Sequence, residues 1–235
     1  DERSLAAEGH WPWQRSKIAD LVNILFAEYG VRVLAFDVLF AETDEASAIE
    51  LLNDLKSLPD SDQLPIDWEA LEYQWQTDSL FAEAVIARNV IIGYVFKPVV
   101  RDNENATSGA LPIATLSAGQ LAAEKIDIPF YEAAGYVGAF EDLQYASDYG
   151  AFFSYPRQDD VIRLSPLMQT YQGDVYESLG LASARLYLGN PPLQFEFQKG
   201  QEKTGLNLDA VLIGDNRIPV DEKTQVYIPF RGQQG

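Results

Sequence analysis

The sequence contains no cysteine and a single histidine, His10. The absence of cysteine excludes disulfides and thiolate chemistry, and one histidine cannot build a zinc site from His and Cys ligands. A Ser/His/Asp triad would have to recruit His10, which lies in an N-terminal lead and is expected to be an ordinary surface residue. We therefore expect a chain that folds without a metal or a cofactor.

Long apolar runs are also absent, since no stretch approaches the roughly 20 apolar residues of a membrane-spanning helix. The first residues, Asp1-Glu2-Arg3, lack the chemistry of a signal peptide. The sequence has no G-x-S-x-G elbow, no Walker loop, no G-x-G-x-x-G after a strand and no H-E-x-x-H. Acidic residues are so abundant that no carboxylate pair stands out, and we expect that the chain is not an enzyme.

Basic residues are scarce, with 17 Lys and Arg against 36 Asp and Glu and a net charge of −19. This balance argues against nucleic-acid binding, which depends on cations that contact phosphates, and against an anionic membrane surface. The 235 residues are 47% hydrophobic and 12% aromatic, which is enough to bury a core. The length suits one large domain or two small ones.

The N-terminal third has the pattern of an α/β protein. Apolar residues recur at helical spacing from Ile18 to Tyr29, with Ser16 as the expected N-cap and Gly30 as the residue after the helix. In residues 31–40, apolar side chains occupy both odd and even positions, which predicts a strand buried on both faces. A second strand is expected at residues 89–100, and the helices between the two strands predict a right-handed parallel crossover.

The rest of the chain alternates between further elements and polar connections. We expect helices at residues 45–56 and 178–188, segments capped by Asp67 and Asp78, a polar loop at 101–110 with the sequon Asn105-Ala106-Thr107, and strands at 161–171, 209–213, 217–220 and 225–230, with a hairpin turn at Gly214-Asp215-Asn216. Residues 111–150 give the weakest signal. The predicted fold is a single α/β domain with a central mixed, partly parallel sheet flanked by helices, and with an antiparallel C-terminal hairpin.

Acidic residues gather after the first predicted strand. Asp37 interrupts the strand near its end, Glu42 and Asp44 follow, and Asp78 starts a later helix of the same unit. Such carboxylates at a sheet edge suit a hard cation such as Ca²⁺ or Mg²⁺. In the alternative, Asp37 is a buried acid satisfied by amides or an arginine, while Asp44 and Asp78 cap helices. We favour this structural interpretation because caps are commoner than bound ions.

Two further features complete the candidate site. Arg163, at a turn-to-strand junction, is able to bind an anion, although in so acidic a chain an ion pair is the better expectation. A pocket at the carboxyl ends of the two strands would be acidic and would suit a cation or an amine-bearing ligand. In the alternative, Trp11 and Trp13 plug this edge, since indoles bury a large area.

Four segments in order along the chain together resemble the CHASE2 family. They are His10-Trp11-Pro12-Trp13-Gln14-Arg15-Ser16; Ala35-Phe36-Asp37-Val38-Leu39-Phe40 with Glu42 and Asp44; Asp78-Ser79-Leu80-Phe81-Ala82-Glu83-Ala84-Val85 with Asn89-Val90-Ile91-Ile92; and Asp159-Asp160-Val161-Ile162-Arg163-Leu164-Ser165-Pro166-Leu167 with Ser178-Leu179 and Ile228-Pro229-Phe230-Arg231-Gly232. Asp160 stands where the family usually has a glycine, and Asp tolerates the same turn. Residues 45–76 resemble an insertion into the family pattern.

The resemblance implies an extracytoplasmic sensor domain of a bacterial signalling protein. Such domains usually follow one transmembrane helix and precede others, with a cytoplasmic cyclase, diguanylate cyclase, histidine kinase or Ser/Thr kinase as the output module. The ligands of the family are largely undefined, so the resemblance assigns no binding residue. We therefore expect a periplasmic or extracellular sensor with an unknown small-molecule or protein stimulus. The alternative is an interaction module that recognises another envelope protein or drives homodimerisation, without a small ligand.

Overall fold

The computed structural model describes residue 9 and residues 11–43, 45–59, 61, 64–155 and 163–229. Its helices are α2 (Arg15–Ala27), α3 (Glu45–Lys56), α4 (Trp68–Trp75), α5 (Thr77–Val85), α6 (Ala118–Glu124), α7 (Glu141–Ala146), α8 (Leu179–Tyr187) and the 3-10 helix η2 (Gly205–Asn207). Its strands are β1 (Leu34–Ala35), β2 (Val90–Lys97), β3 (Thr107–Ser108), β4 (Tyr131–Glu132), β5 (Gly135–Val137), β6 (Tyr149–Phe152), β7 (Leu164–Pro166), β8 (Met168–Tyr171), β9 (Asp174–Glu177), β10 (Leu193–Phe197), β11 (Leu208–Ile213), β12 (Asn216–Pro219) and β13 (Gln225–Tyr227). Within these ranges no helix is both long and apolar enough to cross a lipid bilayer.

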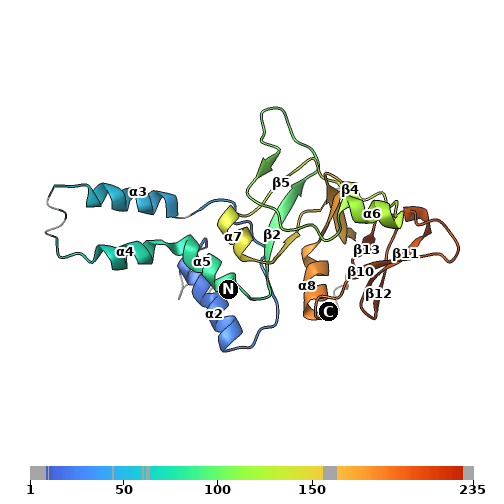
Figure 1. Ribbon diagram of the computed structural model, residues 1–235, viewed down its shortest axis with the longest axis horizontal. Helices are drawn as coiled ribbons and strands as arrows, with labels where there is room; N and C mark the ends of the chain where they lie inside the picture. Colours follow the sequence, from blue (N-terminus) through green and yellow to red (C-terminus); the bar gives the residue numbers. More distant parts are fainter. Residues whose placement is uncertain are drawn as a thin grey trace.

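Strand β2 is the centre of the main sheet (Figure 1). It pairs in parallel with β1 and β6 and antiparallel with β5, which in turn pairs in parallel with β3. Side chains alternate along a strand, so Val90 and Ile92 face the layer of α2, α5 and α7, while Ile91 packs with α8. The mixed, partly parallel sheet flanked by helices is therefore confirmed, as is the parallel crossover between the first two strands.

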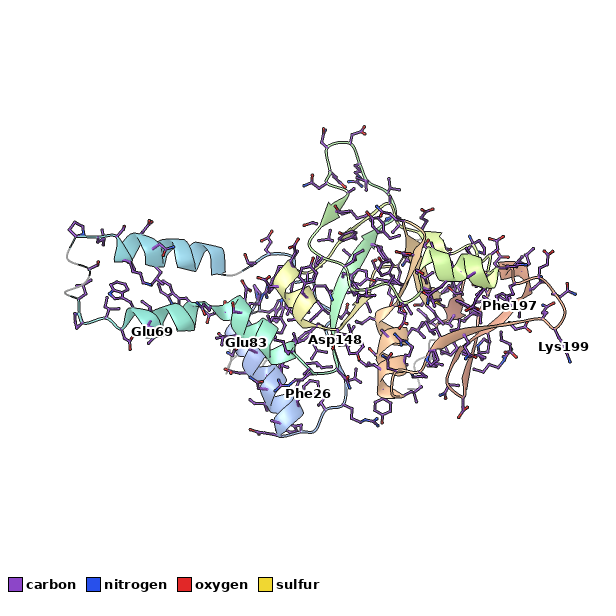
Figure 2. The ribbon with its side chains drawn as sticks, in the orientation of Figure 1. Phe26, Glu69, Glu83, Asp148, Phe197 and Lys199 are labelled. Carbon is purple, nitrogen blue, oxygen red and sulfur yellow. The ribbon has the colours of Figure 1, made fainter. Side chains whose placement is uncertain are left out.

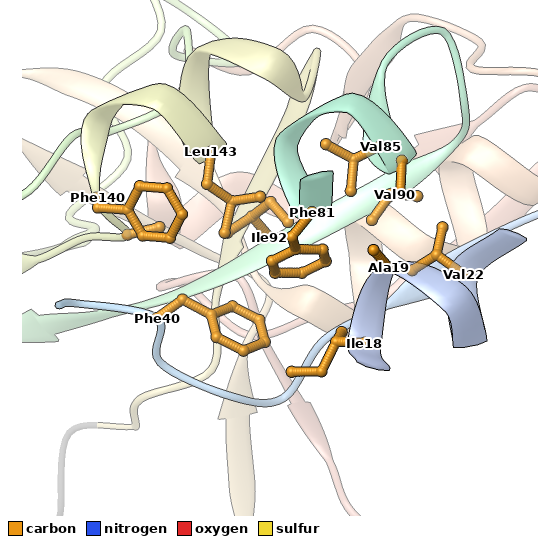
Figure 3. Close-up of a cluster of buried hydrophobic side chains, with 12 residues drawn as sticks. Ile18, Ala19, Val22, Phe40, Phe81, Val85, Val90, Ile92, Phe140 and Leu143 are labelled. Carbon is orange, nitrogen blue, oxygen red and sulfur yellow. The ribbon is translucent and has the colours of Figure 1, made fainter. Parts of the chain in front are cut away.

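An aromatic cluster fills the space between this sheet and the helical layer. The rings of Phe36, Phe40 and Phe81 meet edge to face with centroids 5.1 to 5.6 Å apart. Ile18 and Val22 pack against the cluster from α2, and Leu143 packs against it from α7 (Figure 3). Edge-to-face packing of this kind adds to the stabilisation from buried area alone.

The C-terminal half consists of small sheets. Strands β10, β11 and β12 form an antiparallel meander whose second turn lies between Ile213 and Asn216, as the hairpin pattern predicts. Strand β4 pairs in parallel with β8, which forms a hairpin with β9, and β13 returns to pair with β7. Ser178 caps α8 by accepting a hydrogen bond from the amide of Leu181, which confirms the predicted start of this helix.

Helices α3 and α4 form an arm that projects from the body of the molecule (Figure 1). Figure 2 shows Glu69 on this arm and Glu83 on α5, at its base. The carboxylate of Asp67 accepts a hydrogen bond from the amide of Ala70 at 3.0 Å and so caps α4, as predicted. The arm corresponds to the residues that resemble an insertion.

Four predictions about local structure are wrong. The strand expected at residues 161–171 is divided in its described part into β7 and β8, which belong to different sheets. The first strand contracts to Leu34–Ala35, because the chain leaves the sheet after the amide of Phe36 donates to the carbonyl of Ile91. Helix α2 begins at Arg15 with Gln14 as its N-cap, so Ser16 lies inside the helix. Asp78 also lies inside a helix, α5, rather than at its cap, because its carboxylate is directed to a buried arginine.

Candidate functional site

The buried arginine is Arg15, on which three segments of the chain converge. Its Nε atom lies 3.6 Å from Oδ1 of Asp78, and only 8% and 4% of the two residues are exposed. The guanidinium also donates to the backbone carbonyl of Glu42 at 3.3 Å and lies over the ring of Phe40, 4.7 Å from its centroid. The Arg15 side chain thus joins α2, α5 and the chain after β1. The carboxylate of Asp78 therefore has a structural role.

The predicted site residues are divided between separate places. Asp37 is exposed, so the expectation of a buried acid on the strand is wrong, and Glu42 contributes its backbone carbonyl to the Arg15 cluster. Arg163 lies in the C-terminal half, where its carbonyl accepts a hydrogen bond from the amide of Ile228. Asp44 lies outside the described residues, as do His10 and Asp160. Among the residues that the structure describes, no three acidic or histidine side chains are grouped as they would be around a metal ion.

The two tryptophans before α2 have different environments. Trp13 packs against the core cluster of the helical layer and its indole nitrogen donates to the carbonyl of Gly9 at 3.1 Å. Trp11 is half exposed and contacts Trp13 edge to face. The pair therefore covers the end of the helical layer.

A cavity of about 340 Å³ opens at the amino ends of β2 and β6, and we call it the central cavity. Its walls come from the starts of these two strands, from residues 112–116, from α8 and from the chain that enters β10. Asp148, one of its lining residues, lies in the middle of the molecule between the helical layer and the C-terminal sheets (Figure 2). A ligand in this cavity would contact both halves of the fold.

Glu177, which is buried, and Arg185, which is partly buried, form an ion pair in the wall of the central cavity. The Nε atom of Arg185 lies 2.8 Å from Oε1 of Glu177 and donates to Oε2 at 3.1 Å. The same guanidinium donates to the side chain of Asn190 and to the carbonyl of Pro191, which fixes it at the end of α8. Burial raises the pKa of Glu177, and the charge of Arg185 and the hydrogen bond from Thr115 oppose this rise without cancelling it.

Close packing leaves little room for a side chain at Gly150, which lines the cavity. A Cβ atom at this position would lie 2.8 Å from Oε1 of Gln144 and 2.9 Å from Cγ of Pro112. Gln144 is buried, and neither atom of its amide has a hydrogen-bond partner among the described residues. A buried amide of this kind is costly unless it is satisfied, and Gln144 lies behind Gly150 rather than among the residues that line the cavity.

Sequence reasoning did not identify Glu177 or Arg185. Each residue is ordinary in its local context, with Glu177 at the end of a strand and Arg185 in the last turn of a helix, where a cation suits the helix dipole. The available signal is that Glu177 directly precedes the Ser178 cap while Arg185 lies in the last turn of the helix that this cap begins. That arrangement alone does not reveal burial.

The family profile described as the CHASE2 domain matches residues 1–234, which is almost the entire chain. No curated protein and no solved structure matches the chain.

Proposed function

The chain belongs to the CHASE2 family, and from this premise we propose that it is the periplasmic or extracellular sensor of a membrane-anchored bacterial signalling protein. CHASE2 domains are extracytoplasmic sensory domains of signalling proteins. In our proposal, membrane helices flank the domain and a cytoplasmic cyclase or kinase receives its signal. The observation that carries the proposal is the extent of the family match, which reaches from residue 1 to residue 234.

The fold offers a physical basis for such sensing. A sensor needs two states, and its stimulus must bind one of them more tightly. The central cavity lies between elements of both halves, namely the amino ends of β2 and β6 on one side and α8 on the other. A ligand there would shift the balance between two spacings of these elements. The Glu177–Arg185 pair offers both charge signs to such a ligand.

Membrane topology tests the proposal directly. The full-length protein is expressed in a bacterium, and protease is added to intact spheroplasts and to lysed cells, with an antibody against this domain as the probe. We expect digestion of the domain in intact spheroplasts, while a cytoplasmic control protein survives. Protection of the domain until lysis would refute an extracytoplasmic location.

The helical arm favours a second function, a protein-interaction or dimerisation module without a small ligand. Four large apolar residues of the arm and its tip are exposed: Leu51, Leu58, Leu64 and Ile66. We also propose that residues 45–76, which include the arm, are an insertion into a single domain of 235 residues. Sedimentation at several concentrations tests the alternative, since Leu51→Glu with Leu58→Glu should abolish any self-association. A wild-type chain that stays monomeric throughout would refute dimerisation.

A further inference from the structure

A second cavity, of about 400 Å³, lies on the other side of strand β9 from the central cavity. Tyr176, which lines it, and Glu177, which lines the central cavity, are neighbours on β9 and point to opposite faces. Its most distinctive lining residues are four tyrosines and two acids, and we call it the tyrosine pocket: Tyr136, Glu141, Tyr145, Tyr171, Asp174 and Tyr176. These residues come from β5, α7 and the β8–β9 hairpin.

The aromatic walls of the tyrosine pocket are held by the core beneath them. The rings of Tyr136 and Tyr171 stand at 84° with their centroids 5.3 Å apart. Tyr176 is buried and contacts Phe96 edge to face at 5.6 Å, and Tyr171 stacks on the same phenylalanine at 6.4 Å. The walls therefore exist before any ligand arrives, which lowers the entropic cost of binding.

The charge of the tyrosine pocket has one sign. Among the residues that the structure describes, Glu141 and Asp174 are the ionisable side chains of the pocket other than the tyrosines, and no lysine or arginine lines it. The Oδ1 atom of Asp174 accepts a hydrogen bond from the amide of Ala118 at 2.9 Å, which fixes this carboxylate at the rim. Burial raises the pKa of Tyr136 and of Tyr176, with smaller contributions from the neighbouring acids and tyrosines, so both phenols stay neutral near pH 7.

We propose that the tyrosine pocket binds an organic ammonium cation. Aromatic faces attract such cations through their quadrupoles, the phenol oxygens accept N–H donors, and Glu141 and Asp174 supply the opposite charge. A bare divalent ion is a poorer match, because Ca²⁺ needs six to eight oxygen ligands and the pocket has two carboxylates. An anion would meet repulsion from both acids. This proposal rests on the sensory function proposed above, and it adds that the stimulus binding beside β9 is an organic cation.

Two exposed side chains allow a test that leaves the fold intact. Tyr145 is 72% exposed on α7, and Glu141 is exposed at the start of the same helix. The test variants are Tyr145→Ala and Glu141→Gln. The matched controls are Tyr29→Ala, whose side chain is 74% exposed elsewhere, and Asp142→Asn, which neighbours Glu141 and does not line the pocket.

Isothermal titration calorimetry is performed with choline, putrescine and MgCl₂ on the 235-residue chain. We expect at least one of the two organic cations to bind the wild type and both controls alike. Tyr145→Ala and Glu141→Gln should each raise the dissociation constant about threefold, and the double variant about tenfold. Affinity should fall with added salt because the carboxylates are accessible.

Three results would overturn the inference: no heat with either organic cation, equal affinity in the test variants and the wild type, or a preference for Mg²⁺ that the same variants abolish. Each of them would leave the topology result unchanged. Conversely, protection of the domain in spheroplasts would refute the extracytoplasmic location even if choline or putrescine binds. The two proposals therefore fail independently.

Discussion

Replacing Arg15 with methionine tests whether one buried cation holds the helical layer together. Methionine keeps much of the apolar stem and removes the guanidinium. The change leaves the carboxylate of Asp78, in a residue that is 4% exposed, without the charge that lies 3.6 Å away. It also removes the donor to the carbonyl of Glu42 and the cation above the Phe40 ring.

Two estimates of the stability that Arg15→Met would lose agree. For unit charges separated by 3.6 Å, Coulomb's law with an effective dielectric constant of 20 gives about 4–5 kcal/mol. Breaking a buried ion pair by removing one partner costs about 3–5 kcal/mol in measured cases. We therefore expect Arg15→Met to lower the free energy of unfolding by about 3–5 kcal/mol, and Asp78→Asn by a somewhat smaller amount, since the neutral amide retains the shape and polar character of the side chain.

Urea denaturation followed by circular dichroism and by tryptophan fluorescence measures the effect, and coincidence of the two curves shows whether two-state analysis applies. The double variant completes a thermodynamic cycle, in which we expect a coupling energy of about 2 kcal/mol or more between the two side chains. A loss below about 1 kcal/mol for Arg15→Met, as is usual for surface substitutions, would refute the structural role of Arg15.

Three further substitutions test other parts of the fold. Phe81→Ala removes a ring that is fully buried against Phe36 and Phe40, and should cost about 3–5 kcal/mol in a denaturation experiment; a smaller loss than for an exposed leucine would contradict the packing. Gly93→Ala places a Cβ atom 2.3 Å from the carbonyl oxygen of Phe36 and should cost about 1–3 kcal/mol, whereas Gly180→Ala in α8, with open space around it, should be neutral or stabilising; equal effects would contradict the close approach. Because the pKa of Glu177 is raised above its ordinary 4.5, the folded state retains a proton that the unfolded chain releases, so this protonation stabilises the fold at low pH and the contribution is lost as pH rises through the raised value. Glu177→Gln should therefore show a smaller decline in melting temperature between pH 4.5 and neutrality than the wild type does, and identical declines would refute the assignment.

The helices and the central strand were predictable because their signals are local. Apolar residues from Ile18 onward follow the helical period, and the run at Val90-Ile91-Ile92 has the composition of a strand with two covered faces. Gly30 and Gly189 both adopt positive φ after their helices, as expected for residues that end them. Such features depend on a few neighbouring residues, which the sequence displays directly.

The role of Asp78 was not predictable from its surroundings. An acid before an amphipathic stretch has the pattern of a cap, but the residue that decides its position is Arg15, which is 63 positions earlier in the chain. The close approach of the chain after β1 to β2 depends likewise on a distant residue, Gly93, whose missing Cβ leaves room for the carbonyl of Phe36. Both outcomes follow from contacts between segments that are distant in the sequence.

The tyrosine pocket was even less predictable from local sequence. Its walls come from residues 109–112, from Tyr136, from α7 and from the β8–β9 hairpin. Many of these lining residues belong to residues 111–150, where neither a helical nor a strand period is clear in the sequence. Several tyrosines scattered over 40 residues carry no pattern until pairing between β2 and β5 and packing on Phe96 bring them together.

The pairing of β13 with β7 has a mechanical consequence. Tyr227, at the end of β13, lies opposite Leu164, while Gln225 lies opposite Pro166, from which the chain runs through Leu167 into β8. A pull along the chain beyond residue 229 would therefore load this short ribbon in shear, with its hydrogen bonds strained together rather than opened one after another. The first element to receive the load would be the β8–β9 hairpin, whose two faces line both cavities.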